Sequence, residues 1–442
     1  MKRLLLMMGV AVLAIVLLVS CGDTSGTTAL TSARSVIETT VANKPAESTG
    51  SGAKETTLAP ATTPIPETTL VPETTVTPDT TEAAETDVLG VYDAYDLESY
   101  MTPIWEGNTV YNESVMFVGK DDAAPLLYTP SEIISVRSCD LKTEYRLGVD
   151  YLLEDGKLIL TENSSIPVMA VEEYYPKNSA LYGSFASNLG ADRPLVRWGE
   201  GDTFFRYQVF VTYRHEDSYT GFVPRGQSDK FPKTLEKLKK GEAVKIVYYG
   251  DSITEGYNTS GFIGVAPHAE RWSEMSALYL GKLFGNSSVT AINTGVAGMD
   301  SVWGVQNLTQ RVIDYAPDLC VLAFGMNDGG VAPSLLAQRL VSMAKALRRE
   351  GCEVILVATM LPNKEAAGFW GNQHLFEDAI LKLVEEGDLP FGVVQMSSLH
   401  ASLLEKKPYY HTTGNNINHP NDFLARLYAQ SIVECVTGTP EA

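Results

Sequence analysis

The chain has few cysteines, and none of them is arranged as a metal site. Its 442 residues include five cysteines, and no two form a Cys-x-x-Cys pair. Cys320 and Cys435 lie in segments with the pattern of a buried strand and a buried helix. We therefore interpret the four cysteines after Cys21 as small apolar side chains rather than disulfides or ligands. No group of His and Cys has zinc spacing, so we expect no structural metal and no cofactor.

Basic residues are also scarce. The chain has 34 Lys and Arg against 54 Asp and Glu, a formal net charge of −20. Such a surplus of negative charge repels phosphate-rich surfaces, so we expect neither nucleic acid nor an anionic membrane surface as a partner. A neutral sugar is not excluded by it.

The first 21 residues are typical of an export signal. Lys2 and Arg3 precede an apolar stretch from Leu4 to Leu18, which is shorter than the roughly 20 residues that a membrane span needs. The stretch ends in Leu18-Val19-Ser20-Cys21, which resembles a bacterial lipobox. We expect an exported protein on the bacterial cell surface, attached to the membrane only through a lipid on Cys21. The alternative is a plain signal peptide that is cleaved without lipidation.

The rest of the chain divides into a stalk, a β-type region and an α/β region. Residues 22–87 are rich in Thr, Pro and Glu and nearly free of aromatic residues, which predicts a disordered, extended stalk. Residues 88–215 contain a hairpin signature, Glu154-Asp155-Gly156, and an alternating segment from Phe205 to Tyr213. They predict a small antiparallel β-sandwich of jelly-roll type. A connector, 216–241, includes a short helix from Pro232 to Lys240.

Residues 242–442 alternate strand-like and helical segments, which predicts a parallel sheet covered by helices on both faces. Five strands favour a flavodoxin-like order over a closed barrel. The expected strands are Val244–Tyr249, Val289–Asn293, Leu319–Phe324, Glu353–Met360 and Phe391–Met396. The expected helices are Trp272–Phe284, Val302–Tyr315, Ser334–Arg349, His374–Glu386 and one from about Asn421 to Val436.

Short polar motifs follow three of these strands and precede the last helix. They are Gly250-Asp251-Ser252, then Asn293-Thr294-Gly295-Val296-Ala297-Gly298, then Gly325-Met326-Asn327-Asp328, and finally His419-Pro420. Because the carboxyl ends of parallel strands share one edge of a sheet, these motifs can converge at that edge. In this order they resemble the SGNH/GDSL hydrolase superfamily. The upstream β-region makes the chain similar to two-domain carbohydrate esterases that join a jelly-roll to this fold.

The resemblance implies acyl transfer. Ser252 would attack an ester carbonyl and His419 would accept its proton. The oxyanion would be held by the backbone N–H groups of Ser252 and Gly298 and by the side-chain amide of Asn327. No Gly-x-Ser-x-Gly motif is present, which argues against an α/β-hydrolase.

One position departs from the family pattern. Many members have an aspartate three residues before the histidine, where this chain has Asn416. We expect a Ser252–His419 dyad with a neutral group that orients the histidine, either the Asn416 side chain or a backbone carbonyl. Recruitment of a carboxylate such as Asp422 is the alternative, and a catalytically inactive relic is a third.

Two classes of function are consistent with these features. The first is an extracellular esterase that removes acetyl groups from a carbohydrate, with a lipase-like or lysophospholipase activity as its rival. The second is a glycan-binding surface protein whose hydrolase domain is inactive. Trp272, Trp303 and Trp370 could stack on a sugar ring, although packing in the core is the default for each.

Overall fold

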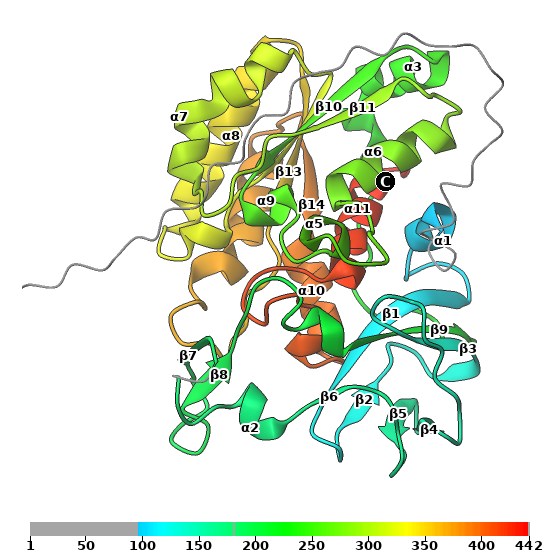
Figure 1. Cartoon of the computed structure of the whole chain (residues 1–442). Coiled ribbons are helices and arrows are strands. Elements are labelled where there is room, and N and C mark those ends of the chain that lie inside the picture. Colours follow the sequence, from blue (N-terminus) through cyan, green and yellow to red (C-terminus); the bar gives the residue numbers. More distant parts are fainter. Residues whose placement is uncertain (1–95, 180–181, 441–442) are drawn as a thin grey trace, which may run out of the picture. The chain divides into compact units, whose positions relative to one another are not determined.

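The parallel sheet predicted from the sequence is present. A computed structural model describes residues 96–179 and 182–440, so the predictions for the signal, for Cys21 and for the stalk lie outside the described residues. The five strands are all parallel and lie in the order β11-β10-β12-β13-β14 (Figure 1). This is the flavodoxin-like order that we expected. The strands are β10 Val244–Gly250, β11 Val289–Asn293, β12 Leu319–Ala323, β13 Glu353–Ala358 and β14 Gly392–Gln395.

Helices cover both faces of this sheet. Val244, Ile246 and Tyr248 of β10 belong to one hydrophobic core, and Val247 and Tyr249 belong to another. This alternation explains why the strand reads as a continuous apolar run. The first core includes side chains of α3 Pro232–Lys240, α6 Trp272–Leu283, α10 Met396–Leu404 and α11 Asp422–Thr437. The second core includes side chains of α7 Ser301–Arg311, α8 Pro333–Arg349 and α9 Phe376–Glu386. Among the described residues, no helix is both long and apolar enough to cross a bilayer.

The region before this sheet is rich in strands, as predicted. A four-stranded sheet has the order β3-β9-β1-β6, a three-stranded sheet has the order β2-β5-β4, and β7 pairs with β8. The elements are α1 Leu97–Met101, β1 Thr109–Val118, β2 Ala123–Pro125, β3 Pro130–Ser138, β4 Tyr151–Glu154, β5 Lys157–Leu160, β6 Val168–Met169, α2 Val171–Tyr174, β7 Ser184–Ala186, β8 Leu195–Arg197 and β9 Gln208–His215. The predicted hairpin is confirmed, and Asp155 and Gly156 form its turn with φ of 48° and 72°. The jelly-roll topology and the domain boundaries remain predictions.

Four details differ from the expected pattern. The sheets are not wholly antiparallel, because β1 and β6 pair in parallel. The alternating segment becomes a strand only from Gln208, since Phe205–Tyr207 form a 3₁₀ turn. Gln208 and Thr212, on the polar face of this strand, are buried rather than exposed to solvent. The Gln208 side chain donates to the Thr413 carbonyl at 2.8 Å. Finally, β14 ends at Gln395 and α10 begins at once with Met396, a helix that the sequence pattern does not predict.

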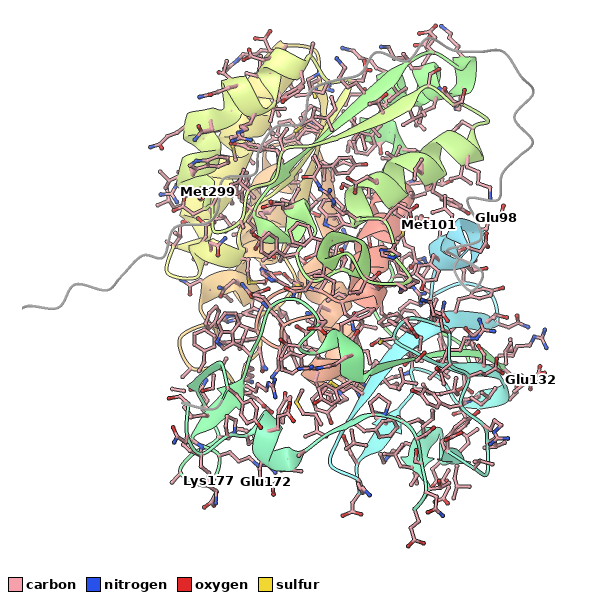
Figure 2. The ribbon with its side chains drawn as sticks, in the orientation of Figure 1. Glu98, Met101, Glu132, Glu172, Lys177 and Met299 are labelled. Atoms are coloured by element: carbon pink, nitrogen blue, oxygen red, sulfur yellow. The ribbon has the colours of Figure 1, made fainter. Side chains whose placement is uncertain are left out.

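The β-rich region is joined to the α/β region by contacts of several kinds. Glu98 and Met101 lie on α1 (Figure 2), and Glu98 forms an ion pair with Lys282 of α6 at 3.2 Å. The Gln430 side chain of α11 donates to the Tyr100 carbonyl at 2.6 Å. The first hydrophobic core also contains residues of both regions. The β-rich region therefore packs directly against α6 and α11, two of the helices that cover one face of the sheet.

Candidate active site

The turn after β10 presents a serine at the carboxyl edge of the sheet. Asp251 caps the short helix α4, Ser252–Glu255, by accepting from the N–H of Ile253 at 3.0 Å. Ser252 is therefore the first residue of that helix, where backbone N–H groups have no partner within the helix. Gly250 is required here, because a Cβ at this position would lie 2.3 Å from the Ala323 carbonyl oxygen.

His419 contacts this serine from the loop before α11. Its Nε2 lies 2.8 Å from Ser252 Oγ, and both residues are buried. The loop is held by Asn415, whose side-chain oxygen accepts from the N–H of Ile417, Asn418 and His419 at 3.0–3.1 Å. The predicted pair of Ser252 and His419 is thus brought together at hydrogen-bonding distance.

Three polar side chains surround the other ring nitrogen of His419. Asn258 Oδ1 lies 2.7 Å from Nδ1, Asn415 Nδ2 lies at 3.0 Å, and Glu200 Oε2 lies at 3.3 Å. The Asn258 amide donates through Nδ2 to the Gly201 carbonyl at 3.4 Å, which turns its oxygen toward the ring. We therefore assign the ring proton to Nδ1, donated to Asn258, and the lone pair to Nε2, which faces Ser252. This is the tautomer that a general base needs.

The predicted oxyanion donors line the same cavity as Ser252. Gly298 has a φ of 76°, a left-handed value that glycine adopts without strain. Asn327 lies in the 3₁₀ turn η5, Met326–Asp328, directly after β12, and its Nδ2 donates to the Met299 carbonyl at 3.0 Å. Met299 is labelled in Figure 2. An amide nitrogen carries two hydrogens, so one remains for the cavity.

The cavity has a volume of about 250 Å³. It is lined by residues of both regions, namely Phe185, Trp198, Glu200, Ser252, Tyr257, Ala297, Gly298, Asn327, Phe369, Asn415, Ile417, Asn418 and His419. Its aromatic wall is continuous, since the Phe185 ring centroid lies 5.4 Å from that of Trp198 and 4.6 Å from that of Phe369. Phe185 belongs to β7 and Trp198 directly follows β8, whereas Phe369 comes from the loop after β13.

The structure does not bring the predicted orienting residues to His419. Asn416 has a φ of 68°, and its side chain points to the β-rich region, where Nδ2 donates to the Arg197 carbonyl at 2.9 Å and Oδ1 accepts from Tyr174 at 3.0 Å. The Asp422 carboxylate accepts from the N–H of Ser260 at 2.7 Å, and burial raises the pKa of Asp422 to about 6. Both side chains thus have structural partners elsewhere.

The residues that sequence reasoning missed are Asn258, Asn415 and Glu200. Asn415 directly precedes the position that the family pattern indicates, so considering the adjacent residue would have found it. Asn258 lies six residues after Ser252, but no motif marks it, and its left-handed φ of 64° is visible only in the structure. Glu200 has no local signal, because it lies in the β-rich region. Trp198 was missed for the same reason. Trp272 is instead buried in the core, and Trp370 stacks on His374.

Residues 248–426 match the family described as "GDSL-like Lipase/Acylhydrolase family". The chain is 38% identical over 73 residues to Esterase TesA of Pseudomonas aeruginosa, 16% of this chain and 36% of that protein. It is 27% identical over 143 residues to an arylesterase of Vibrio mimicus, 32% of this chain and 66% of that protein. The chain therefore spans about a third and just under two thirds of the length of these two relatives.

Solved structures of esterases are also similar. A two-domain esterase (CEX) active on acetylated mannans has 22% identity and a TM-score of 0.39, covering 48% of this chain and 53% of that chain. A catalytic mutant of Axe2, an acetylxylan esterase from Geobacillus stearothermophilus, has 14% identity and a TM-score of 0.37, covering 44% of this chain and 94% of that chain. On this match, residues 248–426 are similar to the GDSL-like lipase/acylhydrolase family.

Proposed function

We propose that this protein is a serine esterase that removes O-acetyl groups from a carbohydrate. The observation that carries the proposal is the 2.8 Å contact between Ser252 Oγ and His419 Nε2 inside a small cavity. A serine hydroxyl is a weak nucleophile unless an adjacent base removes its proton, and the assigned tautomer leaves His419 Nε2 free to do so.

The reaction follows in two halves. Ser252 Oγ attacks the acetyl carbonyl carbon while His419 takes the hydroxyl proton. The resulting oxyanion accepts from the N–H groups of Ser252 and Gly298 and from the amide of Asn327. As the tetrahedral intermediate collapses, His419 returns the proton to the leaving sugar oxygen. Water then attacks the acetyl-serine with His419 as base again, which releases acetate and restores the hydroxyl.

Two features support an acetyl group on a sugar rather than a long acyl chain. The cavity of about 250 Å³ is small, below the usual range of roughly 300–1,000 Å³ for sites that enclose drug-sized ligands. Its lining combines the aromatic side chains of Phe185, Trp198 and Phe369 with polar groups such as Asn327 and Asn418. A pyranose ring has C–H groups on its faces and hydroxyl groups at its edge, and such a wall with a polar rim complements both.

We also propose that the reaction takes place outside the cell. Lys2, Arg3 and the apolar stretch to Leu18 support export, and Cys21 would carry the lipid anchor. The stalk of residues 22–87 would give the enzyme reach toward an insoluble or wall-bound glycan.

The test compares acyl chain length and substrate class with matched variants. We expect wild type to hydrolyse 4-nitrophenyl acetate faster than the octanoate ester, and to release acetate from at least one of acetylated xylan, mannan, chitin oligomers or peptidoglycan. Ser252→Ala should abolish both reactions, while Ser342→Ala, an exposed serine on α8, should leave them unchanged. Equal slow rates for wild type and Ser252→Ala would support the inactive glycan-binding protein, and a preference for octanoate would support the lipase-like activity.

The aromatic wall is tested separately. We expect Trp198→Ala to lower kcat/KM on the acetylated oligosaccharide by about tenfold or more, which corresponds to about 1.4 kcal/mol. The same variant should change kcat/KM on methyl acetate much less, because that ester has no ring to stack. Equal losses on both substrates would contradict the sugar-binding role of Trp198.

A further inference from the structure

Glu200 approaches the catalytic histidine from a different part of the fold. It lies three residues after β8, in the β-rich region, and its side chain is 41% exposed. One carboxylate oxygen lies 3.3 Å from His419 Nδ1, and the other accepts from Asn415 Nδ2 at 3.1 Å. The carboxylate thus contacts both the ring and the residue that holds the histidine loop.

The backbone around Glu200 is fixed to the same two loops. The N–H of Gly199 donates to the Asn415 carbonyl at 3.4 Å, and the Gly201 carbonyl accepts from the Asn258 side chain at 3.4 Å. The Glu200 carbonyl in turn accepts from Thr203 Oγ1 at 2.9 Å. Residues 199–201 are therefore hydrogen-bonded both to Asn415, in the loop that carries His419, and to Asn258, which contacts the His419 ring. The backbone of this segment thus helps to hold the Glu200 carboxylate beside His419.

The neutral neighbours of Nδ1 cannot balance a positive charge by themselves. Asn258 Oδ1 accepts the ring proton but carries only a partial charge. Asn415 Nδ2 has two hydrogens, and these are donated to Glu200 at 3.1 Å and to Asn418 Oδ1 at 3.0 Å. Its 3.0 Å contact with Nδ1 is consequently a contact between two donors, which disfavours the imidazolium that forms when Ser252 is deprotonated.

A carboxylate beside Asn415 and His419 favours the imidazolium instead, because its negative charge attracts the positive charge of the ring. Partial burial acts to raise the pKa of Glu200, but its hydrogen bonds to His419 and to the Asn415 amide, and the positive charge of the His419 ring when it is protonated, outweigh the burial and lower the pKa. Glu200 is therefore ionised at neutral pH. The ring of Tyr257, another titratable side chain, lies beside that of His419, with the two ring centroids 5.3 Å apart. It is neutral at that pH, because burial raises its pKa.

We infer that Glu200 is a positioning carboxylate for His419, supplied by the β-rich region in place of the aspartate that is missing at position 416. Asn258 holds the tautomer, and Glu200 stabilises the charge that the ring acquires in the transition state. The two tasks that one aspartate performs in a serine-protease triad are thus divided between two residues. This inference rests on the proposed function, since it concerns the same Ser252–His419 pair.

The test uses the full chain and Glu200→Gln, which removes the charge but keeps the shape. We expect kcat on 4-nitrophenyl acetate to fall on the order of 10- to 100-fold, less than the roughly 10⁴-fold loss when a triad aspartate becomes asparagine, because Asn258 still fixes the tautomer. The midpoint of the acid limb of the kcat/KM profile should move to lower pH, because the ring loses the charge that favours its protonated form. Glu172→Gln, an exposed glutamate on α2 (Figure 2), is the matched control and should change neither.

A second measurement separates charge from packing. Because Glu200 is 41% exposed, the space left by Glu200→Ala is open to solvent, and added formate should restore part of the lost rate. A loss in Glu200→Gln without a shift of the acid limb and without rescue would overturn the inference in favour of a structural role. Full activity in Glu200→Gln would also overturn it. Failure of the proposed function is a different result, in which wild type is no more active than Ser252→Ala.

Discussion

A buried ion pair between the two regions gives the sharpest prediction about stability. Glu113 of β1 and Lys407, in the loop after α10, form a salt bridge in which both side chains are 0% exposed. Glu113 also accepts from Tyr213 at 2.6 Å and from the N–H of Leu127 at 3.1 Å, and Lys407 donates to the Pro125 carbonyl at 3.2 Å. Burial lowers the pKa of Lys407, and the Glu113 carboxylate opposes that change.

Removing one partner should cost far more than removing both charges. Lys407→Met keeps the length of the side chain but leaves Glu113 buried with two neutral donors. Loss of one member of a buried pair typically costs about 3–5 kcal/mol, and the two remaining donors place the expected loss near the lower end, at about 3 kcal/mol. In the double variant Glu113→Gln/Lys407→Met no charge remains buried, and the amide oxygen introduced at position 113 can still accept from the N–H of Leu127. We therefore expect a loss of only about 1 kcal/mol in the double variant.

Urea unfolding followed by tryptophan fluorescence measures these differences. Lys240→Met is the matched control, because Lys240 pairs with Glu236 on the surface of α3, and we expect no measurable change. A loss of less than about 1 kcal/mol in Lys407→Met, or a double variant as unstable as the single one, would contradict this expectation.

Two further predictions concern Asn327, at the carboxyl edge of the sheet, and His400, on α10. Asn327→Ala should lower kcat by about 10²–10³-fold with little change in KM, because one oxyanion donor is lost; a loss confined to KM would contradict that role. His400 is fully buried between the N–H of Leu361 and the Thr412 hydroxyl, and burial lowers its pKa to about 3. Since the unfolded chain takes up a proton below about pH 6.5 that the folded chain does not, this group should reduce the unfolding free energy by up to about 1.4 kcal/mol per pH unit on acidification. The slope of unfolding free energy against pH should be flatter by that amount in His400→Gln, and an unchanged slope would show that His400 is protonated in the fold.

The sheet could be predicted because its strands leave a strong local pattern. Strands buried on both faces form continuous apolar runs, and the turns after β10 and β12 carry their polar residues within a few positions of the strand end. This is why the sequence alone indicated Ser252 and Asn327 as candidate site residues. The limits of single strands and the helix α10 were less clear, because β14 passes into α10 without a turn residue.

The surroundings of His419 could not be predicted, because they depend on backbone direction and on contacts between regions. At position 416 a left-handed φ of 68° turns the side chain away from the histidine, and nothing in the residue type signals that turn. The preceding residue, Asn415, does reach His419 Nδ1. Its side-chain oxygen cannot accept the ring proton, however, because it already accepts from backbone N–H groups of its own loop. Glu200 depends on a contact between regions that are far apart in the sequence.

The β-rich region contributes residues to the cavity of Ser252 itself. Phe185, Trp198 and Glu200 lie within one short segment of that region, and all three line the cavity of Ser252. The next residue, Gly201, accepts a hydrogen bond from the side-chain amide of Asn258 through its carbonyl. The side-chain oxygen of Asn258 in turn lies at hydrogen-bonding distance from His419 Nδ1. A fragment starting at Glu242 would keep Ser252, His419, Gly298 and Asn327. It would lose the aromatic side chains of Phe185 and Trp198, the Glu200 carboxylate and the Gly201 carbonyl that accepts from Asn258. We therefore expect catalysis to depend on the β-rich region directly, rather than only through binding of a glycan at a distance.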